Sequence, residues 1–264
     1  MSDHVPGGTS PSLYGSESGG SPAPAAKPQG VLDQFIGLFT EPTVVFQRLR
    51  QAPSWLPALL VFMGVALLAS LIWAAKVDQV AMTERRFEVM EQAFKMQMPA
   101  EAVDKALDQV QTAKPPYVSA VLGTLLGMPF GYLLFAAILF AFAKFGGEDE
   151  TTTFRHALAA TTVHGLVALP IPLLAGVMAL LKDVGGAASY ASLAPTTLNF
   201  WLQPENPWVR GALAVLDPFY LFSFFTLYLA ARHTLRLKQG ALIGLMILMG
   251  FFGFVGHFMG GLFS

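Results

Sequence analysis

The chain has 264 residues, of which 54% are hydrophobic and 12% are charged, and its mean hydropathy is +0.54. A soluble domain carries about 25% charged residues, so this composition excludes an ordinary soluble globule and indicates lipid as the solvent for the apolar excess. A net charge of −1 gives a nucleic-acid partner no electrostatic support, and the lack of cysteine excludes a disulfide framework, a thiolate nucleophile and a cysteine metal site.

Residues 1–30 form a predicted disordered tail. Twenty of them are Ser, Gly, Pro or Ala, and they show no apolar periodicity. Such a segment cannot bury enough surface to offset the entropy lost on ordering. The tail also lacks a basic segment followed by an apolar one, so we expect no cleaved signal peptide and a single membrane domain over residues 31–264.

The segment after the tail predicts a short helix lying in the membrane interface. Thr40 is a suitable N-cap, Pro42 stands in the first turn, and Phe46 lies on the apolar face. Arg48 and Arg50 would then lie on the headgroup side. A helix packed beneath a helical bundle would show nearly the same pattern.

Five segments are apolar and long enough to cross a hydrocarbon core, which takes about 20 helical residues. They are residues 55–75, 118–143, 157–181, 209–231 and 240–263. The sequence therefore predicts an all-α membrane protein, and an odd number of spans places the two chain ends on opposite sides of the membrane.

The long charged segment between the first two spans, Lys76 to Tyr117, predicts a helical hairpin outside the membrane. It holds six Lys or Arg and seven Asp or Glu residues, and Pro99 separates two apolar stripes at helical spacing. We expect these stripes to pack on each other and on the bundle; the alternative is a groove that binds a partner.

The number of basic residues does not orient the predicted bundle, but their local density does. Lys and Arg residues total eight on each side of the membrane, but the turn from Arg232 to Lys238 places three of them close to span ends, where they count most. This favours an N-terminus inside and a C-terminus outside.

Several motifs, taken together, resemble the Yip-domain family of Ypt/Rab-interacting membrane proteins in its bacterial branch. They are the entry FTEPTVVFQRLRQAPSWLPAL, the stretch GGEDETTTFRHALAATTVHGLVALP and the fourth span DPFYLFSFFTLYLAA. The residues that carry the resemblance are Phe39, Pro42, Phe46, Pro53, Trp55, Phe154, Pro170 and Phe219.

The resemblance implies five spans, a cytoplasmic N-terminus, no known catalytic activity and no cofactor. Eukaryotic relatives act in vesicle trafficking through Rab GTPases and other Yip proteins. Their Asp-Leu-Tyr-Gly-Pro signature is absent, since Leu13, Tyr14 and Gly15 are flanked here by Ser12 and Ser16. The resemblance therefore does not extend to GTPase binding, and an integral protein of the bacterial inner membrane is the expectation.

Two rows of glycines predict close helix packing. The second span carries Gly123, Gly127 and Gly131 at four-residue intervals, and the fifth span carries Gly253, Gly256 and Gly260. Small residues on one face let a neighbouring helix backbone approach closely. The pattern leaves open whether that neighbour belongs to the same chain or to another.

Three ionisable residues at membrane depth are the candidate site residues, because a charge there is costly unless it is paired. They are Asp217, His164 and His257. Asp217 and His257 fall at overlapping depths, so we expect them to pair; the alternatives are Arg210, water, or Asp217 acting as a structural pin beside Pro218. A histidine with one satisfied hydrogen bond can equally be structural.

No catalytic constellation is found, and we expect no enzyme, metal or cofactor. The acidic run Glu148, Asp149 and Glu150 fits the start of the third span, where negative charge complements the helix dipole. The sequence favours a non-catalytic membrane-organising or adaptor protein, with a small transporter or channel subunit as the alternative. A transporter needs polar groups through the full depth of the membrane. In the apolar stretch of the second span only Thr124 is polar, which favours the adaptor.

Overall fold

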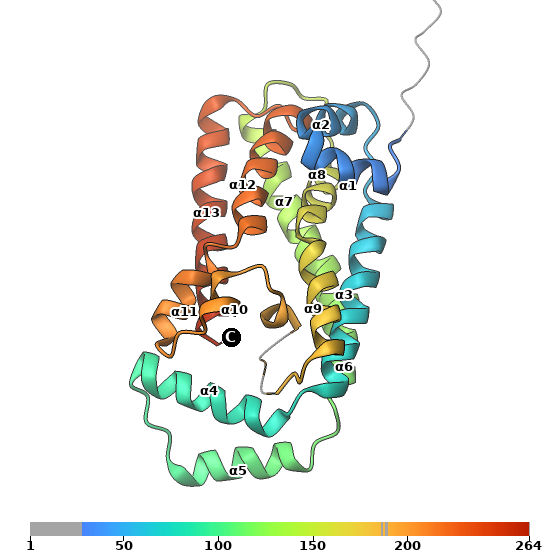
Figure 1. Ribbon diagram of the computed structural model, residues 1–264. Helices are drawn as coiled ribbons and strands as arrows, with labels where there is room; N and C mark the ends of the chain where they lie inside the picture. Colours follow the sequence, from blue (N-terminus) through green and yellow to red (C-terminus); the bar gives the residue numbers. More distant parts are fainter. Residues whose placement is uncertain (1–27, 186, 188–189, 264) are drawn as a thin grey trace, which may run out of the picture.

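The computed structural model describes residues 28–185, 187 and 190–263 of the chain, and the regular structure it describes there is helical (Figure 1). The α-helices are α1 (Val31–Thr40), α2 (Pro42–Gln51), α3 (Leu56–Lys76), α4 (Gln79–Phe94), α5 (Ala100–Gln111), α6 (Tyr117–Leu122), α7 (Met128–Gly146), α8 (Phe154–Gly165), α9 (Pro170–Leu181), α10 (Leu198–Leu202), α11 (Pro207–Ala214), α12 (Pro218–Leu229) and α13 (Gln239–Leu262). Short 3₁₀ or π turns join some of them: η1 (Gly123–Gly127), η2 (Leu166–Ala168), η3 (Tyr190–Leu193) and η4 (Ala230–Thr234).

The all-α fold and its membrane spans are confirmed, with one correction. Within the described residues, four helices are long and apolar enough to cross a membrane: Leu56–Lys76, Tyr117–Gly146, Phe154–Leu181 and Gln239–Leu262. The predicted fourth span is broken into Pro207–Ala214 and Pro218–Thr234, which meet at an angle of 42°. Five spans result if this bent pair crosses the membrane as one.

Proline begins many of these helices. The first residue of α2, α9, α11 and α12 is Pro42, Pro170, Pro207 and Pro218, respectively. The backbone N–H at this position has no acceptor within the helix, so proline loses no hydrogen bond there. The prediction of Thr40 as the N-cap of α2 was wrong. α1 continues through Thr40, whose hydroxyl donates to the Ile36 carbonyl at 3.1 Å.

The buried core is thickest at the end of the bundle where α1 and α2 lie across the spans (Figure 1). Phe46 of α2 is fully buried there. α8 contributes Ala157, Ala159 and Ala160, and these small side chains let its neighbours approach closely. We call this end, which also carries the α7–α8 and α12–α13 connections, the N-terminal end.

The charged segment between the first two spans folds into α4 and α5 at the opposite end, which we call the hairpin end (Figure 1). Asp78 caps α4 by accepting hydrogen bonds from two backbone N–H groups. α4 lies between α5 and the bundle, with Val89 buried and the Phe94 ring 6.0 Å from that of Trp208. The last helix, α13, also ends at this side. The position of the hairpin relative to the membrane surface stays a prediction.

Candidate functional site

The break in the fourth span is built around Asp217. Pro218 disfavours a helical backbone at the residue before it, and Asp217 has extended torsions of φ −65° and ψ 123°. One carboxylate oxygen, Oδ1, accepts hydrogen bonds from the backbone N–H groups of Phe219 (2.7 Å) and Tyr220 (3.0 Å). Asp217 is therefore the N-cap of α12.

The second carboxylate oxygen of Asp217 is also bonded. Oδ2 accepts from the Thr196 hydroxyl at 2.6 Å, and the whole residue is 2% exposed. Three donors thus satisfy a buried carboxylate, which offsets the cost of removing it from water. This arrangement matches the alternative prediction that Asp217 has a structural role beside Pro218. Nothing in the sequence indicated Thr196 as its partner.

Asp217 and His257 line one cavity of about 410 Å³, and the Asp217 charge acts on His257, but the two residues do not form the predicted direct pair. Within the described residues no hydrogen bond or ion pair joins them. The His257 ring instead lies against the Tyr220 ring, with 3.9 Å between ring centroids and 37° between the ring planes. The two depths were estimated well, but the Asp217 oxygens turn toward the helix start and Thr196.

His164 belongs to a separate polar contact. Its Nδ1 lies 3.0 Å from the Thr226 hydroxyl oxygen, and Thr226 also donates to the Ser223 carbonyl. Thr226 stands nine residues beyond Asp217, which is about 13 Å along a helix. The three ionisable candidates therefore do not form one site.

The glycine row of the second span, predicted to pack closely against a helix, meets no close neighbour within the described part of this chain. A Cβ on Gly123, Gly127 or Gly131 would have no neighbouring heavy atom within 4 Å. A π-helical turn, Gly123–Gly127, begins and ends at the first two glycines of this row. It precedes Pro129, whose missing N–H leaves a carbonyl of the preceding turn without its usual donor.

The row of the fifth span is partly corrected too. Gly256 and Gly260 face open space beside the Asp217 cavity, and a Cβ on Gly253 would lie 2.8 Å from the Tyr220 hydroxyl oxygen. The close backbone crossing instead uses Gly211 of α11 and Gly261 of α13. A Cβ on Gly211 would lie 2.9 Å from the Phe258 carbonyl oxygen, and one on Gly261 would lie 2.9 Å from the Arg210 carbonyl oxygen.

An ion-pair network joins three segments at the N-terminal end. Arg50, at the end of α2, donates from Nη2 to both Asp149 oxygens at 2.7 and 2.9 Å. Arg236 reaches the same carboxylate at 3.3 Å, and Arg232 pairs with Glu148 at 2.8 Å. Hydrogen bonds from the hydroxyl and backbone N–H of Thr151, together with the Arg50 charge, lower the pKa of Asp149 to about 2.

The helix-dipole interpretation of the acidic run was therefore wrong. α8 begins at Phe154, and Thr153 caps it in a capping box with His156. Glu148 and Asp149 instead tie the α7–α8 connection to α2 and to the α12–α13 turn. No spacing in the sequence could indicate a contact between positions 50 and 149, because only the folded bundle brings these segments together.

A family model supplies the identification. The model of the Yip1 domain matches residues 36–259, which is most of the chain. The chain belongs to the Yip1 domain family. No curated protein and no solved structure gives a match.

The residues that carry the resemblance have structural positions in this Yip1 domain. Phe39 stacks on Phe222 with 5.3 Å between centroids, and the Phe154 ring meets Phe140 edge to face. The Pro53 carbonyl, just before α3, accepts a hydrogen bond from Arg155 at 3.1 Å. These residues position α1 and α2 against the bundle. The prolines that begin helices, and the Asp217 cap that bonds the Phe219 N–H, set where the helices start.

Proposed function

We propose that this Yip1 domain is a non-catalytic membrane-organising or adaptor component that binds other membrane helices through the glycine row of its second span. The observation that carries the proposal is the open row of Gly123, Gly127 and Gly131. The second span is, with the fifth, among the spans least covered by the rest of the chain. An exposed row of small residues is the kind of surface on which membrane helices associate.

Helix energetics support this interpretation. A glycine inside a helix costs about 0.5–1 kcal/mol relative to alanine, because the unfolded chain loses more freedom. Within the described chain no neighbour uses the space above these three glycines, so nothing inside the protein offsets that cost. A helix from a second copy or from another membrane protein would do so.

Site-specific crosslinking tests the proposal. The chain has no cysteine, so Gly127→Cys gives a single attachment point for benzophenone maleimide in native membranes. The matched control is Leu125→Cys, which is also exposed but lies on another face of the same helix. We expect a discrete protein adduct at position 127 and mainly lipid adducts at position 125, with mass spectrometry identifying the captured chain. Equal capture at both positions would remove the basis for the proposal.

A small transporter or channel subunit is the second candidate, and the break in the fourth span favours it. Discontinuous spans beside a polar cavity are typical of transporters. The test is proton flux into proteoliposomes that contain a pH-sensitive dye, compared between the wild type and Asp217→Asn. A flux that the substitution abolishes would favour this candidate over the adaptor.

We place the protein in the bacterial inner membrane with the N-terminus inside. Arg50, Arg232 and Arg236 gather at the N-terminal end, and basic residues near span ends are typical of the cytoplasmic side. Its expected partners are lipid and other membrane proteins or a second copy, with no nucleic acid and no Rab-type GTPase.

A further inference from the structure

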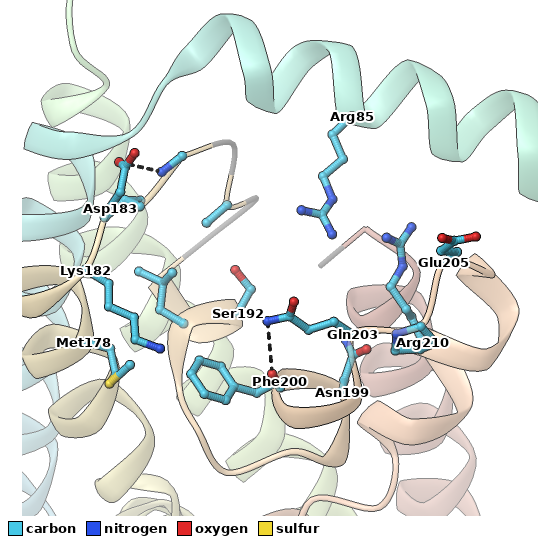
Figure 2. A pocket seen from close by; sticks show the side chains of 15 residues that line it. Arg85, Met178, Lys182, Asp183, Ser192, Asn199, Phe200, Gln203, Glu205 and Arg210 are labelled. Atoms are coloured by element: carbon cyan, nitrogen blue, oxygen red, sulfur yellow. Dashed lines mark hydrogen bonds between the residues drawn. The ribbon is translucent and has the colours of Figure 1, made fainter.

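A second cavity, of about 570 Å³, opens at the hairpin end between α4, the end of α9 and α11 (Figure 2). Three cationic side chains line it: Arg85 from α4, Lys182 just beyond α9, and Arg210 from α11. Figure 2 shows the guanidinium groups of Arg85 and Arg210 entering the same space from facing walls. The cavity therefore gathers positive charge from three elements.

Arg210 is the buried member of this group. The residue is 9% exposed, and its Nη2 donates to the Leu262 carbonyl at 3.3 Å. Its Nε is buried and has no acceptor among the described residues. A buried guanidinium group with an unmatched donor is costly, and Figure 2 shows the end of this group extending into the cavity, where a ligand oxygen can reach it.

Nearby carboxylates do not satisfy Arg210. Asp183 and Glu205 also line the cavity, and Glu88 is close enough to act on Arg210 electrostatically. Within the described residues none of the three forms an ion pair with Arg210, and Asp183 accepts from the Gly185 backbone N–H at 3.2 Å. The cavity walls themselves carry three cations and two carboxylates, and Glu88 lies nearby without lining the cavity.

The cavity lies at the expected level of lipid headgroups. Leu180 and Leu181, directly before Lys182, are 61% and 75% exposed, as lipid-facing side chains would be. Trp201 and Trp208 are also exposed at this end of the bundle. Tryptophan collects at the boundary between hydrocarbon and water, so these residues mark that boundary beside the cavity.

We propose that this cavity binds a phosphate group, and that its source is the headgroup of an anionic phospholipid. A tetrahedral phosphate offers oxygens in several directions, which suits donors converging from separate walls, and guanidinium groups bind it through paired hydrogen bonds. The bound oxygens would accept from the guanidinium group of Arg210, while Arg85 and Lys182 would supply further positive charge. This site is independent of the glycine row and of any adaptor role.

Thermal unfolding of the purified full chain in detergent tests the site. The probes are dioleoyl phosphatidylglycerol, dioleoylglycerol with the same acyl chains and no phosphate, and inorganic phosphate. We expect the phosphatidylglycerol to raise the unfolding temperature in a saturable way and dioleoylglycerol to have little effect. Arg210→Gln and Arg85→Gln should each weaken the apparent affinity about tenfold, as expected for the loss of a charge-assisted hydrogen bond.

Arg86→Gln is the matched control, because Arg86 follows Arg85 on α4, is exposed and does not line the cavity. It should retain wild-type affinity. If Arg210→Gln does not fold, Arg85→Gln and Lys182→Gln, both at exposed positions, carry the test. Stabilisation by inorganic phosphate alone, with the same arginine dependence, would support the phosphate site and overturn the lipid source. Equal stabilisation by dioleoylglycerol, or wild-type affinity in the arginine variants, would overturn the site.

Discussion

At the scale of single residues, Asp217 and Asp149 have opposite surroundings and similar roles. Asp217 is buried inside the broken span and accepts three hydrogen bonds. Asp149 lies in a connection at the N-terminal end and binds two arginines. Each carboxylate joins segments that are distant in sequence, so each is expected to contribute to stability rather than to catalysis.

The low pKa of Asp149 predicts a loss of stability in acid. Its folded pKa of about 2 lies below the ordinary 3.8, so its contribution is complete above about pH 4 and is lost as the pH falls toward 2. Because the pair is partly exposed, we expect about 1 kcal/mol. Unfolding temperatures of the wild type and Asp149→Asn, measured from pH 6 to pH 2.5, should differ at the upper end and converge at the lower end.

The exposed neighbour Glu150 provides the control for this experiment. Glu150→Gln should follow the wild type across the whole range. If Asp149→Asn also followed the wild type at pH 6, the ion-pair network would contribute nothing to stability.

The cap at Asp217 makes a prediction that separates asparagine from alanine. Asparagine is also a good N-cap, and its amide can donate to the Thr196 hydroxyl, so Asp217→Asn should cost less than about 1 kcal/mol. Asp217→Ala removes every acceptor and should cost about 2–4 kcal/mol. Thermal unfolding in detergent measures both, and equal losses would mean that the hydrogen bonds do not hold the break.

At the scale of helices, the structure separates glycines that touch a neighbour from glycines that do not. Gly211 and Gly261 allow α11 and α13 to cross with their backbones close together. The row around Gly127 faces open space. Both patterns look alike in the sequence, because both place glycines on apolar helices.

Leucine substitutions distinguish these two kinds of glycine. A side chain on Gly261 would overlap Ala214 and the Arg210 carbonyl, so Gly261→Leu should destabilise the protein by several kcal/mol. Gly127→Leu should change the stability of the isolated chain by less than about 1 kcal/mol, since leucine is a better helix former and meets no neighbour. Unfolding temperature and monodispersity in detergent measure the difference, and a collapse of Gly127→Leu would show an unrecognised contact there.

At the scale of the whole molecule, the two ends of the bundle differ in composition and architecture. The N-terminal end holds the ion-pair network and the thick core, whereas the hairpin end holds α4, α5 and the cationic cavity (Figure 1). If the bent pair counts as one span, α1 and the end of α13 lie on opposite sides of the membrane.

Cysteine labelling tests the orientation of these ends. With no native cysteine, Thr151→Cys reports on the N-terminal end and Lys105→Cys on the hairpin end. An impermeant maleimide added to intact cells should label position 105 and leave position 151 unlabelled until the membrane is permeabilised. The reverse result would invert the orientation and leave the fold unchanged.

Signals that act within one segment of the chain were enough to predict the class of this protein and most of its membrane-spanning helices. Apolar runs of membrane length predicted the spans, and prolines predicted several helix starts, because both signals act within one segment. The motifs also led to the family. Two local features differ from the prediction: Thr40 ends α1 instead of capping α2, and the fourth span is broken at Asp217 into two helices, although Asp followed by Pro is a common start for a new helix.

The helix faces that contact each other became clear only from the folded bundle. Thr196 as the partner of Asp217, Asp149 as the partner of Arg50, and Gly261 rather than Gly127 as the packing glycine all depend on how the helices are rotated against each other. In a soluble protein, hydropathy separates the buried face of a helix from the exposed one. In a membrane, lipid is as apolar as a protein core, so the sequence pattern does not record that rotation, and packing and hydrogen bonding between distant segments set it.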